Sequence, residues 1–394
     1  MLNNQIGDLS ILRNSPDSLH VQLYTCLRKL VVSGRWPHES RIPSEIEIAQ
    51  YLHISRSTVR LALHKAEMEG LIKRIAGRGT FVAYLPLRER ESHLIAFLTS
   101  AFDAESHPII MMLKGVENEA KARGYQVTFN NVQDHRDEIA FLQRIRQDEV
   151  AGVVLWPDAA ASHPLLGNSF AYQGIQLPLV LLDRQVYGLE CDCVTSDNYS
   201  GARALISHLV GLGHRQIVFL SHHETDLLTV KERYRAYRDV MSEAGLTPFE
   251  PWLIGQPGNE MGAKYTLRST VDVNSPELQE IKAYMLGAPE RPTAIFALHD
   301  YLAILAVRAL RLLNIRVPDQ VSVAGFDDTD PAVHLEVLLT TVAQDPFTIG
   351  KQAARRLIDR IEGYVGPTEC QLIPTQLRVR GSTAPVYSFD LKGR

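Results

Sequence analysis

The sequence has few cysteines and only short apolar runs, and these two shortages exclude several classes of protein. Four cysteines in 394 residues do not make the disulfide framework of a small secreted domain. Apolar runs such as 151–156 and 176–182 are strand-sized, far below the roughly 20 residues of a membrane-spanning helix. The N-terminus carries Asn3, Asn4 and Arg13 and has no apolar signal core. We therefore expect a cytoplasmic protein with no membrane partner.

The motifs of nucleotide hydrolysis, redox catalysis and metal binding are also missing. No Walker A loop and no dinucleotide-binding fingerprint occurs. Cys191-Asp192-Cys193 has no second ligand pair at zinc spacing, and His222-His223-Glu224 lacks the second histidine of a zinc-protease helix. We therefore expect no cofactor, no metal and no catalytic residues.

What the chain does have is an uneven distribution of charge. The length suggests two or three domains, and the 45% hydrophobic and 22% charged content is that of ordinary soluble proteins. Residues 1–84 contain eleven Lys and Arg against seven Asp and Glu, a net charge of +4. Because the whole chain has a net charge of −4, the remaining residues carry a net charge of −8. A small basic segment before a larger acidic one indicates nucleic acid as a candidate partner.

Residues 18–52 have the pattern of two consecutive helices. Leucines at three- and four-residue spacing predict an amphipathic helix over 18–33. Pro43 ends the structure before it, and Ser44 with Glu47 three residues later is the signature of a capping box. We therefore expect a short second helix that begins after Ser44.

A third helix with a cationic face is predicted after a tight turn. Ser55 is placed to cap a helix that runs to about residue 69. Arg56 and Arg60 are four residues apart and share a face, away from an apolar stripe made by Val59, Ala62, Leu63 and Ala66. A helix, a tight turn and a second helix with a basic N-terminal half is the arrangement that enters the DNA major groove.

Two short strands, 71–75 and 80–83, are predicted next, with Arg78 at the tip of their hairpin. These elements together make a winged helix-turn-helix. Four motifs in it resemble the GntR family of bacterial transcription regulators. They are Ile-Pro-Ser-Glu at 42–45, Ile-Ser-Arg-Ser-Thr-Val-Arg at 54–60, Glu-Gly-Leu-Ile at 69–72 and Gly-Arg-Gly-Thr-Phe-Val at 77–82.

The GntR resemblance covers roughly residues 16–84 and implies that a double-stranded DNA operator is bound by the helix start and the wing. The residues implied are Ser55, Arg56, Ser57, Thr58, Arg60, Arg78, Gly79 and Thr80. Ile46 departs from the family, in which many members have arginine or asparagine at this position. The operator sequence is therefore not implied by the resemblance.

The rest of the chain has the organisation of an α/β protein. Residues 85–92 are charged, contain proline and lack apolar periodicity, as linkers do, and separate a domain at 1–84 from one at 93–394. Beyond the linker, strand-like and helix-like segments alternate, which predicts parallel sheets over a span long enough for two lobes. Ligands of such sheets lie beyond the carboxyl ends of the strands.

Polar side chains follow several of the predicted strands. They are Trp156, Asp183 with Arg184, His299 with Asp300, and Asp327 with Asp328. Carboxylates and an arginine can satisfy adjacent hydroxyl groups, and an indole can cover the apolar face of a sugar ring. The alternatives for the Asp327-Asp328 pair are acid–base chemistry and, for Asp328 in particular, a structural role such as capping a helix.

Residues 93–385 resemble the effector domain of the LacI/GalR family, which has the fold of periplasmic sugar-binding proteins. The motifs lie at 196–202, 213–217, 233–237, 317–328, 339–344 and 380–383. The resemblance implies that Arg233 and Asp327 are the principal effector-binding pair. It implies that Trp156, Asp183, His299 and Gln344 also line the cleft, and that Asp300 supports the cleft structurally.

Two positions depart from the LacI/GalR pattern. His299 stands where many relatives have asparagine, and His107-Pro108-Ile109 stands where Asn-Pro-Phe is usual. The identity of the effector is therefore not implied.

A GntR-type head on a LacI-type body resembles the L-arabinose-type repressors of Gram-positive bacteria. We therefore expect a homodimeric repressor released from its operator by a monosaccharide or a derivative of one. Within the regulators, a purine or another small metabolite is the alternative effector. A sugar-binding sensory or transport protein and a sugar-processing enzyme are the alternatives from other classes.

Overall fold

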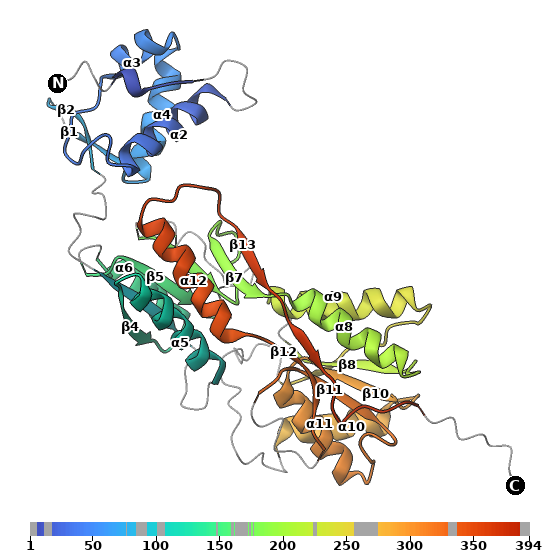
Figure 1. The fold of residues 1–394 in the computed structure, drawn as a ribbon. Helices are drawn as coiled ribbons and strands as arrows, with labels where there is room; N and C mark the ends of the chain where they lie inside the picture. Colours follow the sequence, from blue (N-terminus) through green and yellow to red (C-terminus); the bar gives the residue numbers. More distant parts are fainter. Residues whose placement is uncertain are drawn as a thin grey trace, which may run out of the picture.

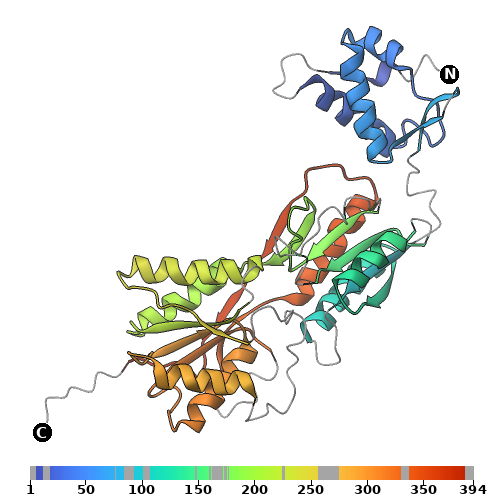
Figure 2. The same ribbon diagram turned by 180° about the vertical axis from the view of Figure 1, so that it is seen from behind.

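The computed structural model describes residues 6–11, 18–75, 77–83, 93–100, 107–146, 149–158, 161, 172, 175, 177–223, 227–255, 275–329 and 337–386. Figure 1 and Figure 2 show three parts in a row. They are a head (6–83), an adjacent N-lobe (93–196 with 346–373) and a distal C-lobe (198–343 with 376–386). The linker expected at 85–92 lies outside the described residues.

The head is a winged helix-turn-helix, as the sequence predicts. Its elements are η1 (Ile6–Asp8), α2 (Leu19–Val32), α3 (Glu45–Leu52), α4 (Arg56–Met68), β1 (Ile72–Ile75) and β2 (Gly79–Val82). The capping box of α3 is present: Glu47 N–H donates to Ser44 Oγ at 3.3 Å, and Ser44 N–H donates to Glu47 Oε2 at 2.7 Å. Trp36, Leu23 and Leu63 are fully buried in one core, so the head has a hydrophobic centre of its own.

The N-lobe is built on a six-stranded parallel sheet in the order β13-β7-β6-β5-β3-β4. Its strands are β3 (Leu94–Thr99), β4 (Gln126–Asn131), β5 (Gly152–Trp156), β6 (Leu179–Leu182), β7 (Asp192–Ser196) and β13 (Cys370–Ile373). Its helices are α5 (His107–Ala122), α6 (His135–Arg144) and α12 (Pro346–Ile361). β5 and β7 are almost wholly buried, as expected for parallel strands covered on both faces.

The C-lobe repeats this plan with the order β14-β12-β11-β10-β8-β9, in which only β14 is antiparallel to its neighbour. Its strands are β8 (Ile217–His222), β9 (Trp252–Ile254), β10 (Ala294–Ala297), β11 (Ser322–Asp327), β12 (Thr340–Ala343) and β14 (Gln376–Arg378). Its helices are α8 (Asn198–Gly211), α9 (Leu228–Glu243), α10 (Pro276–Gly287) and α11 (Asp300–Leu312). Both lobes therefore turn the carboxyl ends of parallel strands toward one cleft.

The chain passes between the lobes three times, after β7, after β12 and after β13. The second passage returns α12 to the N-lobe, where it packs against α5. A Cβ at Gly350 would lie 1.9 Å from the Met112 carbonyl oxygen, and one at Gly115 would lie 2.1 Å from that of Phe347. Only glycine permits this approach of the two backbones, so α12 is fixed to the N-lobe although it follows a C-lobe strand.

The structure adds elements that the sequence analysis does not predict, namely η1, β7, β9, α10, β12, α12, β13 and β14. β5 ends at Trp156 and β11 ends at Asp327, so these two residues are the last of their strands, whereas the sequence analysis expected them to follow the strands. None of the helices in the described parts of the chain combines the length and apolarity needed to cross a bilayer.

Candidate functional site

The cationic face of the head is formed by α4, whose start is fixed by its cap. Ser55 Oγ accepts the Thr58 N–H at 3.1 Å and lies 2.7 Å from the Ser57 hydroxyl. Val59 and Leu63 are buried in the head core, so Arg56 and Arg60 on other faces of the helix are left exposed. The cap and the core together therefore present both guanidinium groups to solvent.

Arg60 is paired, but weakly enough to exchange its partner. Its Nε lies 3.3 Å from Glu45 Oε2, and its side chain remains 61% exposed. Glu45 also forms an ion pair with Arg74, whose Nη2 lies 3.4 Å from Glu45 Oε1. Exposed pairs of this kind contribute at most about 1 kcal/mol, so a phosphate or a base edge can replace Glu45 as the acceptor for Arg60.

The wing places a second set of predicted residues at the tip of the β1–β2 hairpin. Arg78 is exposed there, and its N–H donates to Ile75 O at 3.0 Å. Gly79 has φ +116°, and a Cβ on it would lie 3.1 Å from Arg41 Nε. Arg41 therefore lies against the wing and adds an exposed cation that the sequence analysis did not select; its place directly before the Ile-Pro-Ser-Glu motif is the available signal.

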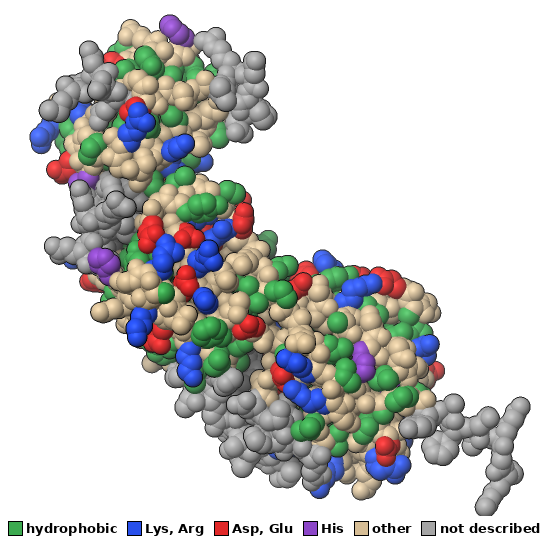
Figure 3. Space-filling model, viewed as in Figure 1, with side chains coloured by type: hydrophobic (Ala, Val, Ile, Leu, Met, Phe, Trp, Pro, Cys, Tyr) green, Lys and Arg blue, Asp and Glu red, His purple; other side chains and the backbone are tan. Residues whose placement is uncertain are grey.

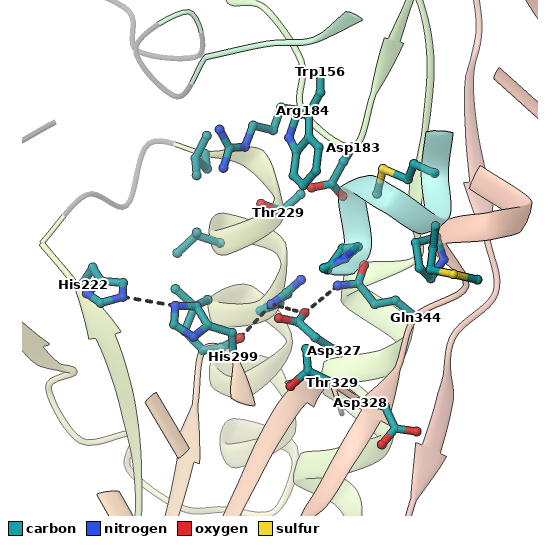
Figure 4. Close-up of a pocket in the computed structure, with 18 of the residues that line it drawn as sticks. Trp156, Asp183, Arg184, His222, Thr229, His299, Asp327, Asp328, Thr329 and Gln344 are labelled. Carbon is teal, nitrogen blue, oxygen red and sulfur yellow. Dashed lines mark hydrogen bonds and ion pairs between the residues drawn. The ribbon is translucent and has the colours of Figure 1, made fainter. Parts of the chain in front are cut away.

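The body contains a cavity of about 420 Å³ that both lobes line. Figure 4 shows Trp156, Asp183 and Arg184 on one side and His222, His299 and Asp327 on the other. All seven cleft residues predicted from the sequence line this one cavity: Trp156, Asp183, Arg184, Arg233, His299, Asp327 and Gln344. A volume of this size suits a small molecule and not a macromolecule.

Arg233 and Asp327 form a charged floor that belongs to the C-lobe. Arg233 Nη1 lies 3.7 Å from Asp327 Oδ1 and donates to Leu298 O at 2.7 Å, while its Nε donates to Asn198 Oδ1 at 2.8 Å. The guanidinium lies 3.7 Å from the centroid of the Phe326 ring. Arg233 is only 7% exposed, so its orientation is fixed before any ligand arrives.

Burial and the neighbouring Arg233 have opposite effects on the pKa of Asp327. Burial raises the pKa of its carboxyl to about 6, against the effect of the Arg233 guanidinium. Gln344 Nε2 donates to its Oδ1 at 2.5 Å, and Ser196 Oγ donates to Gln344 Oε1 at the same distance. Asp327 has φ +120°, a backbone conformation that side chains rarely adopt, and such strain is often found at ligand sites.

Asp300 lies beneath the cavity and not in its wall. It is fully buried and accepts the Thr341 hydroxyl at 2.5 Å and the Thr329 N–H at 2.8 Å. Burial and the nearby Asp327 carboxylate raise its pKa to about 8. Asp328 lines the edge of the cavity and pairs with Arg380 at 2.6 Å, so its carboxylate is engaged in a structural contact.

A pair of neutral histidines forms another side of the cavity. His222 Nε2 and His299 Nε2 are 3.1 Å apart, and burial lowers the pKa of His222 to about 4 and that of His299 well below its usual value. His299 Nδ1 accepts the Leu302 N–H at 3.3 Å. Its proton is therefore on Nε2 and is donated to His222, which leaves the His222 proton on Nδ1.

Sequence reasoning did not select His222 or its neighbour His223, although both line the cavity. They lie at the end of β8, so the rule of inspecting residues directly after each strand identifies them. Thr229 and Met112 also line the cavity but come from helices, where that rule does not apply.

The opposite wall of the cavity comes from the N-lobe. The Arg184 guanidinium lies 5.5 Å from the centroid of the Trp156 ring and donates to Pro157 O at 3.3 Å. Asp183 takes φ +60°, and Thr195 Oγ1 donates to its carbonyl at 3.0 Å. In the described parts of the chain, no three His, Cys, Asp or Glu side chains gather as metal ligands would.

Comparison with known proteins divides the chain in the same way. Residues 19–82 match the bacterial regulatory proteins of the gntR family, and residues 206–383 match the periplasmic binding protein-like domain. The chain is 30% identical over 346 residues to the arabinose metabolism transcriptional repressor of Geobacillus stearothermophilus, covering 87% of this chain and 91% of that one. It is 29% identical to the repressor of the same name from Halalkalibacterium halodurans, covering 83% and 84%.

A solved structure supports the fold. The complex of the transcriptional regulator CelR with cellobiose superposes with a TM-score of 0.61 at 23% identity, covering 86% of this chain and all of that chain. The winged-helix head and the two-lobed α/β body expected from the sequence are therefore confirmed.

Proposed function

The chain belongs to the family of transcriptional repressors that join a gntR-type DNA-binding head to a periplasmic-binding-protein-like body, and on that premise we propose that a small polyhydroxylated effector releases it from its operator. The observation that carries the proposal is the buried pair of Arg233 and Asp327, 3.7 Å apart on the floor of a cavity that both lobes line.

The cavity chemistry supports a sugar or a sugar derivative. A carboxylate and a guanidinium held side by side offer an acceptor and donors to neighbouring hydroxyl groups. Neutral His222 and His299 line the cavity without adding charge, and the Trp156 indole offers a flat apolar surface. Relatives named for arabinose metabolism and a fold relative solved with cellobiose support the same class of ligand.

The three interlobe passages support a route from the cleft to the DNA. An effector that contacts both lobes favours their closed arrangement, and closure alters how two bodies pair in a homodimer. The two heads of that dimer then no longer match the half-sites of a near-palindromic operator. This requires the effector to bind the DNA-free arrangement more tightly, by about 1–3 kcal/mol. Such a repressor acts in the cytoplasm, where the DNA is.

Tryptophan fluorescence offers a direct test of the ligand class. The chain has three tryptophans, of which Trp36 is buried in the head and Trp252 stacks on Tyr284 with ring centroids 5.3 Å apart. A panel of pentoses, hexoses, sugar phosphates and nucleobases is titrated into the full chain. A sugar is expected to change the fluorescence emission of the wild type and of Trp252→Phe, and to leave the emission of Trp156→Phe unchanged. A response to nucleobases alone would favour the purine alternative.

Two further measurements distinguish a repressor from an enzyme and from a sensory protein that does not respond through DNA. Steady product formation from a ligand of the panel would indicate catalysis at the Asp327-Asp328 pair. A ligand that binds without changing the affinity for duplex DNA would indicate a sensory protein. The proposal expects no turnover and a weakened DNA complex.

A further inference from the structure

Two cysteines face each other at the edge of the N-lobe sheet. Cys370 begins the edge strand β13 and is the register partner of Cys193 in β7. Adjacent strands lie about 4.7–4.9 Å apart, within the roughly 4.4–6.8 Å between the Cα atoms of disulfide-linked residues. Each thiol is close enough to the other to shift its pKa. A bond between the sulfur atoms therefore needs little movement of the backbone.

The two thiols have different surroundings. Cys370 is exposed, whereas Cys193 is 2% exposed. Hydrogen bonds from the Cys193 thiol and from Gln185, whose Nε2 lies 3.2 Å from the Cys370 sulfur, lower the pKa of Cys370 to about 7. The contact with Cys370 and burial raise the pKa of Cys193. At neutral pH about half of the exposed Cys370 thiol is therefore ionised, next to a buried Cys193 thiol that stays protonated.

The remaining two cysteines differ from this pair. Cys191 donates to Leu179 O at 3.1 Å, and burial raises its pKa to about 12. Cys26 lies half-buried in the head and donates to Asp8 O at 3.8 Å. Both are suited to serve as internal controls for reactivity.

We propose that Cys370 and Cys193 form a reversible redox site that reacts with peroxides. The Cys370 thiolate attacks one peroxide oxygen, the O–O bond breaks, and the other oxygen leaves as hydroxide or alkoxide and takes a proton from water. The Cys193 thiol then attacks the sulfur of the Cys370 sulfenic acid, its proton joins the departing hydroxide, and water leaves. Two thiols are oxidised to one disulfide, and the peroxide is reduced to water and an alcohol, or to two waters.

The site lies at the base of two interlobe passages. Cys193 lies three residues before the end of β7, and Cys370 lies three residues before the end of β13. After each of these strands the chain crosses to the C-lobe. The two passages are joined where the Asp197 N–H donates to Ile373 O at 2.8 Å. The disulfide therefore adds a covalent tie between two of the three connections between the lobes. Because Cys370 is exposed, cellular thiols can reach the bond and reduce it.

The test uses the full chain, reduced and then exposed to graded hydrogen peroxide. Intact-mass analysis is expected to show the loss of two hydrogen atoms, and peptide mapping without reductant is expected to show one linked pair containing Cys193 and Cys370. Dithiothreitol should reverse both changes. Alkylation of Cys370 by iodoacetamide should rise with pH around a midpoint near 7 and exceed that of Cys191 by at least about tenfold.

Single variants separate the roles of the two thiols. In Cys193→Ser the sulfenic acid at Cys370 should persist and be trapped by dimedone, and Cys370→Ser should form neither product. Cys191→Ser and Cys26→Ser are the matched controls and should behave as the wild type. Cys193→Ala, checked by its unfolding transition, covers the case in which serine disturbs the buried position.

Three results would overturn the proposal. They are a disulfide that involves Cys191 or Cys26, oxidation of Cys370→Ser at the wild-type rate, and conversion of wild-type Cys370 to the sulfinic acid without a linked peptide.

Discussion

The head and the body hold the charges of their candidate sites in opposite ways. In the head, Arg56, Arg60 and Arg78 are exposed and come from one stretch of sequence. In the body, Arg233 and Asp327 are drawn from α9 and β11 and are largely hidden from water. The side chains of Arg60 and Arg233 are 61% and 8% exposed, so the two sites differ chiefly in the hydration of their charges.

The proposed ligands account for this difference. DNA brings a dense row of phosphates, so cations on the head can remain hydrated until they displace counterions. The proposed effector brings only a few hydroxyl groups, so its partners must be oriented in advance within the cavity. The cost of that orientation is visible in the positive φ of Asp183 and Asp327 and in the raised pKa of Asp327.

One face of the two lobes differs from the cationic face of the head. On the face shown in Figure 3, cationic and acidic side chains are interspersed over both lobes. Pairs such as Arg123–Glu362 and Arg356–Glu369, the latter at 2.7 Å, neutralise cations of the N-lobe. The head and the body therefore differ in the exposure of the cations at their candidate sites as well as in their net charge.

Removing Arg233 should have the largest effect on ligand binding and stability, and should show how far the body depends on its buried charge pair. Arg233→Ala is expected to weaken effector binding by about 2–5 kcal/mol and to lower the free energy of unfolding by about 3 kcal/mol, because Asp327 is left buried without its cation. Ligand titration and urea unfolding measure the two quantities. Arg235→Ala, an exposed cation two residues along α9, is the control. Unchanged effector affinity in Arg233→Ala would remove Arg233 from the site.

Removing a head arginine should affect DNA binding and leave the fold intact. Arg56→Ala and Arg60→Ala are each expected to weaken binding to a selected duplex by about 1–3 kcal/mol if they contact bases. Effector binding should not change. Arg35→Ala, which removes an exposed head cation paired with Asp8, is the control. Equal losses on selected and random DNA would identify a phosphate contact instead.

Acid should weaken effector binding through Asp327. Its pKa of about 6 means that the carboxylate is largely protonated at pH 5, so affinity should fall about tenfold between pH 7 and pH 5. Stability should change in the opposite direction. A carboxyl whose folded pKa lies above its unfolded value stabilises the fold below about pH 4, and this contribution is lost as pH rises through 6.

The matched variant for the pH profile is Asp327→Asn, which should bind weakly at every pH in this range. Calorimetric titration at half-unit steps gives the profile. An affinity that rises toward pH 5 in the wild type would contradict the assignment of Asp327 as an ionised acceptor.

The smallest expected effect is on the head alone. Ser44→Ala removes one half of the capping box of α3 and should cost about 1 kcal/mol of head stability. Trp36 fluorescence, measured with Trp156 and Trp252 both replaced by phenylalanine, reports unfolding of the head. Effector affinity should be unchanged, and a change in it would show that the head and the cleft are coupled even without DNA.

Local signals were enough to predict the head. The capping box at Ser44, the cap at Ser55 and the position of Arg78 in the hairpin all depend on residues a few positions apart, and the structure has each of them. The binding roles of the head residues remain predictions. Their exposure is consistent with those roles, and Arg41 is the addition that only the packed wing reveals.

The body was predictable in part. The alternation of strands and helices gave its class, and the strand-end rule gave Trp156, Asp183 and Asp327. β13 could not be predicted from periodicity, because three of its four residues are exposed and it has no apolar alternation. α12 could have been found, since Asp345 caps it and Pro346 occupies its first turn. The tautomers of His222 and His299 depend on a contact across 77 residues, which no local pattern contains.

The most direct test of the account links the two regions in one titration. A fluorescent duplex, selected by the protein from a random pool, is bound to the full chain, and the sugar identified by fluorescence is added while anisotropy is followed. We expect release of the duplex from the wild type and retention by Arg233→Ala at the same sugar concentrations. Release that is equal in both proteins, or a wild-type complex that no bound sugar weakens, would contradict this expectation.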